Sequence, residues 1–152
     1  MITVTRRTAA PPEAVWSVIA DGWSYPAWVV GASRIRAVSA TWPQAGAMIH
    51  HSVGAWPLLL DDNTEVLDVE PGRFLRLKAR GRPYGEAVVE IEIKADGSGT
   101  RIEMREDASN GPARLLPKPL RQAALAPRNA ESLKRLTLLA EAHPSPDGDA
   151  EA

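Results

Sequence analysis

The spacing of hydrophobic residues changes along the chain, and each change marks the start of a different predicted element. Residues Ile2–Thr8 alternate in two sets and are mostly β-branched, which predicts an opening strand. The pair Pro11-Pro12 then favours the first turn of a short helix ending near Gly22, because an N–H there would have no intrahelical partner. A second, very short helix is predicted from Ser24 to Gly31.

From residue 33 onward the period becomes two, which is typical of strands with one buried and one solvated face. In the clearest case, one set of alternating positions is entirely apolar: Ala87, Val89, Ile91 and Ile93. Turn-forming residues separate the six strands predicted at 33–39, 47–53, 58–69, 73–80, 84–94 and 100–107.

The region after the last predicted strand begins irregular and ends helical. Three prolines within residues 112–119 exclude a long strand, and the leucines beside them suggest a loop packed over something apolar. The helix that follows has one stripe formed by Asn129, Leu133, Leu136, Thr137 and Ala140. Two starting points for this helix remain possible: Pro127 lies in its first turn, or a kinked helix begins near Leu120. We expect one domain at 1–143 and a disordered polar tail at 144–152.

These elements predict an α+β architecture with one strand, two short helices, six more strands and one long helix. A seven-stranded antiparallel sheet that is curved around a terminal amphipathic helix buries that helix incompletely. We therefore expect an apolar cavity between the sheet and the helix.

Composition narrows the classes of function. The chain has 152 residues and a formal charge of −1, so we expect no nucleic-acid partner, which would normally require a basic surface. It has no cysteine, which excludes a disulfide framework and a thiol nucleophile. No apolar run approaches the roughly 20 residues that span a bilayer, and the N-terminus lacks a signal-peptide core. We expect a cytoplasmic protein without a membrane span.

Four groups of residues carry a resemblance to a known family: 12–21 with 25–28, 62–69 with 71–77, 97–102 leading to Glu106, and 128–136. The order and spacing of these four groups resemble those of the START-like (SRPBCC) superfamily of helix-grip proteins. Within this superfamily, the chain resembles the polyketide cyclase/dehydrase and lipid-transport branch. The resemblance covers residues 1–142. It implies a deep hydrophobic cavity between the curved sheet and the C-terminal helix.

The resemblance implies a class of ligand rather than one activity. Members bind lipids, sterols, polyketides or other hydrophobic small molecules, a minority catalyse cyclisation, dehydration or hydrolysis, and others act as co-chaperones or toxin-like factors. Segment 57–64 has no glycine run, so the glycine-rich loop of plant pathogenesis-related members is missing. The iron–sulfur and catalytic-iron residues of aromatic-ring oxygenases are also missing. We expect no cofactor.

The adjacent histidines His50 and His51 are the most reactive-looking pair. Neighbours on a strand point to opposite faces, and His143 is the only other histidine, so we expect no metal site. His51 shares its face with Ile49 and Val53, which aims it into the cavity as a base or a hydrogen-bond donor. The alternative is a histidine whose hydrogen bonds are satisfied at the strand surface.

Glu106 shares a strand face with Ile102 and Met104, so it is a candidate acid or base in an apolar setting. The alternative is that it pairs with an arginine or anchors the loop at 109–119. Asn129 and Thr137, on the inward stripe of the last helix, are candidate polar contacts for a ligand; the alternative is that they bond nearby backbone. A weaker inward set on one strand consists of Glu65, Leu67 and Val69. Alternate basic residues on the next strand predict a solvated face, paired to glutamates: Arg76, Lys78 and Arg80.

Three hypotheses of function follow. The first is a protein, monomeric or homodimeric, that binds a hydrophobic small molecule, with Leu115, Leu116 and Leu120 forming part of a lid. The second is a cyclase- or dehydratase-type enzyme in which His51 and Glu106 form the acid/base pair. The third is a co-chaperone-like or toxin-like interaction module. The expected ligand-binding residues are Ile49, His51, Val53, Leu67, Leu75, Leu77, Val89, Ile91, Ile102, Met104, Glu106, Leu116, Asn129, Leu133 and Leu136.

Overall fold

The computed structural model describes residues 1–53 and 57–143, so the tail expected at 144–152 lies outside the described residues. The elements, with η denoting a short 3-10 helix, are β1 (Ile2–Thr8), α1 (Pro12–Ala20), η1 (Gly22–Ser24), α2 (Tyr25–Trp28), β2 (Ala32–Val38), β3 (Met48–Val53), β4 (Leu60–Glu70), β5 (Phe74–Gly81), β6 (Gly85–Asp96), β7 (Gly99–Asn110), η2 (Pro112–Leu115) and α3 (Lys118–Ala142).

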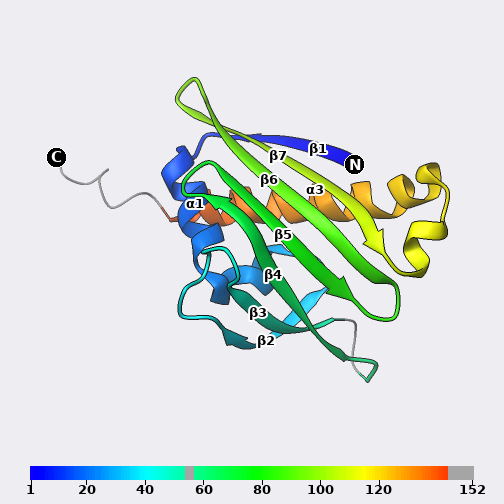
Figure 1. Ribbon diagram of the computed structural model, residues 1–152. Coiled ribbons are helices and arrows are strands. Elements are labelled where there is room, and N and C mark those ends of the chain that lie inside the picture. Colours follow the sequence, from blue (N-terminus) through cyan, green and yellow to red (C-terminus); the bar gives the residue numbers. More distant parts are fainter. Residues whose placement is uncertain (54–56, 144–152) are drawn as a thin grey trace.

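The seven strands form one antiparallel sheet in the order β1-β7-β6-β5-β4-β3-β2. The sheet curves across one side of α3, and α1 packs near the end of that helix (Figure 1). This arrangement confirms the α+β helix-grip fold expected from the alternating pattern. Within the described residues, no helix is both long enough and apolar enough to cross a membrane.

The two short helices follow from local sequence. Pro12 occupies the first turn of α1, and the apolar stripe of that helix is buried. Asp21 caps the start of η1, because its side chain accepts a hydrogen bond from the backbone N–H of Trp23 at 3.1 Å. Tyr25 and Trp28 of α2 are buried, whereas Trp23 faces solvent. Of these two tryptophans, only Trp28 therefore contributes to the buried interior.

Helix α3 begins at Lys118, so the interpretation that put Pro127 in its first turn is wrong. The alternative of a longer helix from near Leu120 is close to what the structure shows. The proline in the first turn is Pro119, where its missing N–H removes no helical hydrogen bond. The buried side chains of α3 all come after Pro127: Asn129, Ser132, Leu133, Leu136, Thr137 and Ala140.

Strand β4 contains a β-bulge, which overturns one prediction about its inward face. The pairing with β5 shifts between Val66 and Asp68, so counting in twos across this point fails. Val69 packs against the core as expected, but Leu67 is exposed and Glu65 contacts a lysine on the outer face. Leu67 and Glu65 are therefore not inward-facing residues.

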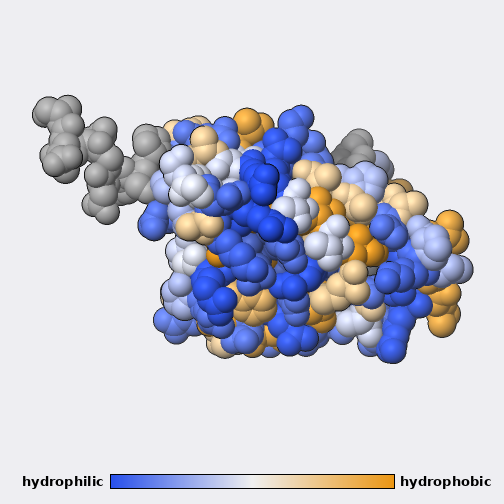
Figure 2. All heavy atoms as spheres, turned by 90° about the horizontal axis from the view of Figure 1, so that it is seen from above, coloured by the Kyte–Doolittle hydropathy of each residue, from blue (hydrophilic) through white to orange (hydrophobic). Residues whose placement is uncertain are grey.

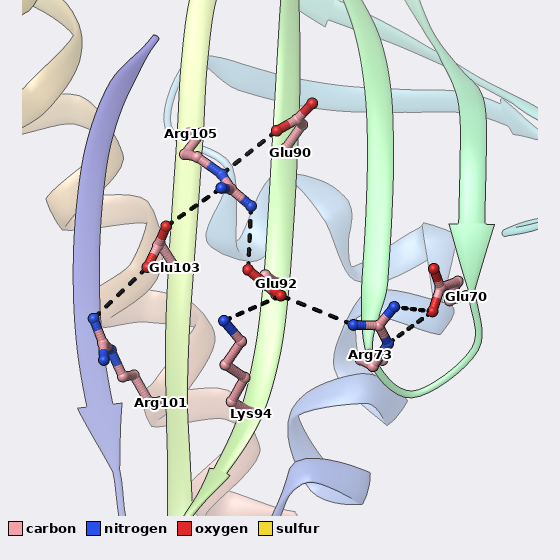
Figure 3. A network of polar contacts seen from close by, with 8 residues as sticks. All are labelled: Glu70, Arg73, Glu90, Glu92, Lys94, Arg101, Glu103 and Arg105. Carbon is pink, nitrogen blue, oxygen red and sulfur yellow. Dashed lines mark hydrogen bonds and ion pairs between the residues drawn. The ribbon is translucent and has the colours of Figure 1, made fainter.

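The outer face of the sheet carries charged side chains paired across the strands (Figure 3). Arg105 of β7 contacts Glu90 and Glu92 of β6 and Glu103 of its own strand. The solvated basic row predicted for β5 is confirmed, because each cation pairs with a glutamate on a neighbouring strand: Arg76–Glu90, Lys78–Glu65 and Arg80–Glu86.

Candidate functional site

A cavity of about 710 Å³ lies between the sheet and the first half of α3. Its lining, which is mostly apolar, comes from α2 and the segment after it, from strands β2 to β7, from η2 and the residue after it, and from α3. Hydrophobic surface is gathered at the end of the molecule where α3 begins (Figure 2). The cavity therefore lies toward the start of α3, whereas the packed core lies toward the end of that helix.

Small side chains leave this space open. The inward positions of β5, β6 and β7 line up in rows across the sheet, and one row consists of Leu77, Val89 and Glu106. The next row, one step closer to the start of α3, consists of Ala79, Ala87 and Ala108. All three alanines line the cavity, and so does Ala124 of α3. Where the sheet offers only methyl groups, it cannot fill the distance to the helix.

The predicted ligand-binding residues divide into four groups. Those that line the large cavity are His51, Val53, Glu106 and Leu116. Those that line a smaller adjoining cavity of about 40 Å³ include Leu77, Val89, Ile91, Met104 and Asn129. Those buried in the core, away from both cavities, are Ile49, Leu75, Ile102, Leu133 and Leu136. Leu67 is on the outer face.

Strand parity identifies which face a side chain occupies, but it gives no position along the strand. The core residues share the inward face with the cavity residues and lie closer to the end of α3. The alanine row was missed although the sequence carries a signal for it. Each alanine extends an inward-facing set at a spacing of two: Leu75-Leu77-Ala79, Ala87-Val89-Ile91 and Met104-Glu106-Ala108.

His51 is buried in the wall of the large cavity. Its Nε2 lies 2.9 Å from the hydroxyl oxygen of Thr64, which lies 3.3 Å from the hydroxyl of Tyr25. The rings of His51 and Tyr25 stack with centroids 5.6 Å apart. Burial lowers the pKa of His51 and raises the pKa of Tyr25, so both groups are neutral near pH 7. The wall thus presents neutral hydrogen-bonding groups here.

Glu106 faces into both cavities and is paired with Arg128 of α3. The Arg128 Nη2 donates to the two carboxylate oxygens at 2.7 and 2.5 Å. The alternative in which an arginine neutralises Glu106 is therefore what the structure shows. Arg128 itself was not foreseen, because helix spacing does not show which strand residue meets it. A second ion pair joins Arg121 of α3, which also lines the large cavity, to Asp107 at 2.6 Å.

The remaining candidates lie around these groups. Thr137 does not line either cavity; its hydroxyl accepts from Arg6 at 3.0 Å and donates to the backbone of Lys134 at 2.9 Å. Of the three leucines expected in a lid, Leu116 lines the large cavity, whereas Leu115 and Leu120 are exposed and line neither.

A curved antiparallel sheet that holds a terminal helix and encloses a cavity beside it defines a helix-grip domain. Residues 1–141 match the family described as polyketide cyclase / dehydrase and lipid transport. The chain belongs to this family. A comparison with curated proteins gave no match.

Solved structures share the fold. A protein from Rhodobacter sphaeroides is 21% identical with a TM-score of 0.71, and the alignment covers 94% of this chain and 93% of that one. The structure of Ara h 8.0201 has 11% identity and a TM-score of 0.67, and the alignment covers 93% of this chain and 97% of that one. The di-domain ARO/CYC StfQ from the steffimycin biosynthetic pathway gives 10% identity, a TM-score of 0.71 and coverage of 92% and 50%. At these identities the similarity shows the fold alone.

Proposed function

We propose that the protein binds a hydrophobic small molecule, such as a lipid, a polyketide-like compound or an aromatic compound, in the large cavity. The observation that carries this proposal is the cavity of about 710 Å³ behind the alanine row. Its volume falls within the range of about 300–1,000 Å³ that is typical of small-molecule sites. Burial of apolar ligand surface against this wall supplies the affinity.

The few polar groups in the wall orient the ligand. His51, Thr64 and Tyr25 form a connected neutral set, and the Glu106–Arg128 pair supplies charged groups whose charges cancel. Such a wall favours ligands that are mostly apolar and carry a small number of polar atoms.

The test is uptake of the neutral fluorescent probe N-phenyl-1-naphthylamine by the purified protein. We expect micromolar or tighter binding by the wild type, and at least a tenfold loss in Ala87→Phe, which places a ring in the cavity. The matched control is Val88→Phe on the next residue of β6, which does not line the cavity and should bind like the wild type. A folded wild-type protein that takes up no probe, or an Ala87→Phe variant that binds normally, would refute the proposal.

Native mass spectrometry of the protein purified from its source complements the probe. It reports the mass of any ligand carried through purification, together with the assembly, for which we expect a monomer or a homodimer. An interaction module that works through its surface needs no open cavity, so the alanine row favours ligand binding over that alternative.

A second candidate function is catalysis in the same cavity, by cyclisation or dehydration of a polyketide-like substrate. The specific observation in its favour is that His51 and Glu106 line one ligand-sized space. The neutral imidazole of His51 is suited to accept a proton, and Glu106 is ion-paired with Arg128. Incubation with a linear poly-β-ketone thioester, followed by mass spectrometry, tests this candidate. Turnover that is unchanged in His51→Gln would exclude the proposed base.

A further inference from the structure

A second cavity of about 40 Å³ adjoins the inner side of the large one, and five residues line both. Trp28 and Asn129 are among the polar side chains of the small cavity that are almost completely buried, at 2% and 1% exposed. A space of this size exceeds the roughly 10–15 Å³ that a single oxygen-sized group requires. The small cavity therefore has room for the polar end of a ligand whose body occupies the large cavity.

The orientation of the Asn129 amide follows from its neighbour. Its Oδ1 accepts a hydrogen bond from Nη2 of Arg128 at 3.2 Å. A guanidinium group only donates, so the oxygen must face Arg128 and the Nδ2 amino group must be the other end. Among residues 1–53 and 57–143, neither this Nδ2 nor Nε1 of Trp28 has a hydrogen-bond partner.

Both groups are N–H donors, and both residues line the same small cavity. A third donor in this lining without a partner among the described residues, Nε of Arg128, belongs to a guanidinium that is already ion-paired with Glu106. Buried donors normally have an acceptor, because leaving them without one costs the free energy of their desolvation. The complementary ligand atom is therefore a hydrogen-bond acceptor, such as the oxygen of a carbonyl or hydroxyl group.

The charge around the small cavity selects a neutral oxygen. The negative charge of Glu106, which lines this cavity, is cancelled by Arg128. Indole and amide donors carry no charge, so no net positive charge remains to compensate a buried anion. A carboxylate would lose its hydration without a counter-ion, whereas a carbonyl or hydroxyl oxygen needs only the hydrogen bonds.

We propose that the small cavity is a subsite for a neutral carbonyl or hydroxyl oxygen at the inner end of the ligand. The N–H groups of Trp28 and Asn129 donate to this oxygen. The subsite rests on the proposed function, because the body of the ligand must first occupy the large cavity. It narrows the ligand class to hydrophobic ketones, aldehydes, esters and alcohols, and it disfavours free carboxylic acids.

The test compares three ligands of nearly equal shape by isothermal titration calorimetry: 2-acetylnaphthalene, 2-ethylnaphthalene and 2-naphthoate. We expect the wild type to bind the ketone roughly tenfold more tightly than the hydrocarbon, which corresponds to one or two neutral hydrogen bonds. The carboxylate should bind more weakly than the ketone.

Two variants remove one donor each: Asn129→Leu and Trp28→Phe. In each of them the ratio of ketone affinity to hydrocarbon affinity should fall at least threefold, while the hydrocarbon remains bound. If Asn129→Leu does not fold, Trp28→Phe carries the test alone. The control is Leu116→Ala in the wall of the large cavity, which should weaken both ligands and leave their ratio unchanged.

The outcomes separate the two proposals. Absence of 2-ethylnaphthalene binding by the folded wild type would overturn the proposed function. Binding of 2-ethylnaphthalene with no preference for the ketone would overturn the subsite alone. So would a preference that survives in the folded donor variants, or 2-naphthoate binding more tightly than the ketone.

Discussion

Replacing Arg128 by methionine should destabilise the protein much more than replacing Arg105 by methionine. The two arginine side chains are similarly exposed, at 37% and 32%. Their partners differ, because the Glu106 side chain is 3% exposed whereas the glutamates around Arg105 are 15–23% exposed. Arg128→Met therefore leaves a buried carboxylate without a counter-ion, while Arg105→Met leaves glutamates that water already reaches.

Removing one partner of a buried ion pair costs about 3–5 kcal/mol, and we expect the lower end because water can approach through the space left by Arg128. Removing a solvent-exposed partner costs about 0–1 kcal/mol. For a domain of this size, 1 kcal/mol shifts Tm by roughly 2–4 °C. Arg128→Met should thus lower Tm by about 6–12 °C, and Arg105→Met by no more than about 4 °C.

The assay is urea unfolding of both variants at pH 7, followed by tryptophan fluorescence and analysed for unfolding free energy and for the slope with urea. Adding Glu106→Gln to Arg128→Met should recover much of the loss, because the uncompensated charge is then gone. If Arg128→Met and Arg105→Met fall within 1 kcal/mol of each other at equal slopes, burial of Glu106 does not have the energetic weight assigned to it.

Three other expectations follow from the structure. Burial lowers the pKa of His51, so the imidazole binds a proton more readily in the unfolded chain than in the folded protein. The unfolding free energy, measured by urea unfolding at several pH values, should therefore decline as pH falls below about 6.5. This decline should be smaller in His51→Gln. A Cβ at Gly99 would collide with the backbone oxygen of Thr8, whereas one at Gly97 (φ +61°) meets open space. Gly97→Ala should lower the unfolding free energy by roughly 1–2 kcal/mol, and Gly99→Ala should lower it by more, as measured by thermal melting. Equal losses of unfolding free energy in the two variants would contradict this. Ligand entry should change the tryptophan emission, and Trp28→Phe should lose most of that change; an undiminished signal would place the responding indole elsewhere.

Much of the fold was predictable because it depends on local rules. Alternation at 87–93 identified the inward face of β6, and the pair Pro11-Pro12 identified the start of α1. The β4 prediction failed at the bulge beside Leu67, because an extra residue in a strand leaves no mark in a binary pattern. Pro127 was misplaced since the packing of α3 tolerates a proline that an isolated helix would disfavour.

The candidate site was only partly predictable. Parity correctly placed His51 and Glu106 on the inward face, since that property depends on the strand alone. The partner of Glu106 was not predictable, because the contact with Arg128 depends on how far α3 slides along the sheet. The extent of the cavity also depends on the position of α3 along the sheet. It depends as well on the row of alanines, whose small volume does not alter the alternation of apolar and polar residues.

The position of Pro127 has a further consequence for α3. Proline has no N–H, so the carbonyl four residues earlier lacks its helical hydrogen bond, at the boundary between the turns beside the cavity and the turns buried in the core. The segment from Lys118 to Ala126 contributes no buried side chain, whereas Leu133 and Leu136 anchor the rest. These first turns should therefore open as a separate local unit, with faster amide hydrogen exchange than the anchored part. Such opening would let a bulky ligand enter and leave while the core stays folded.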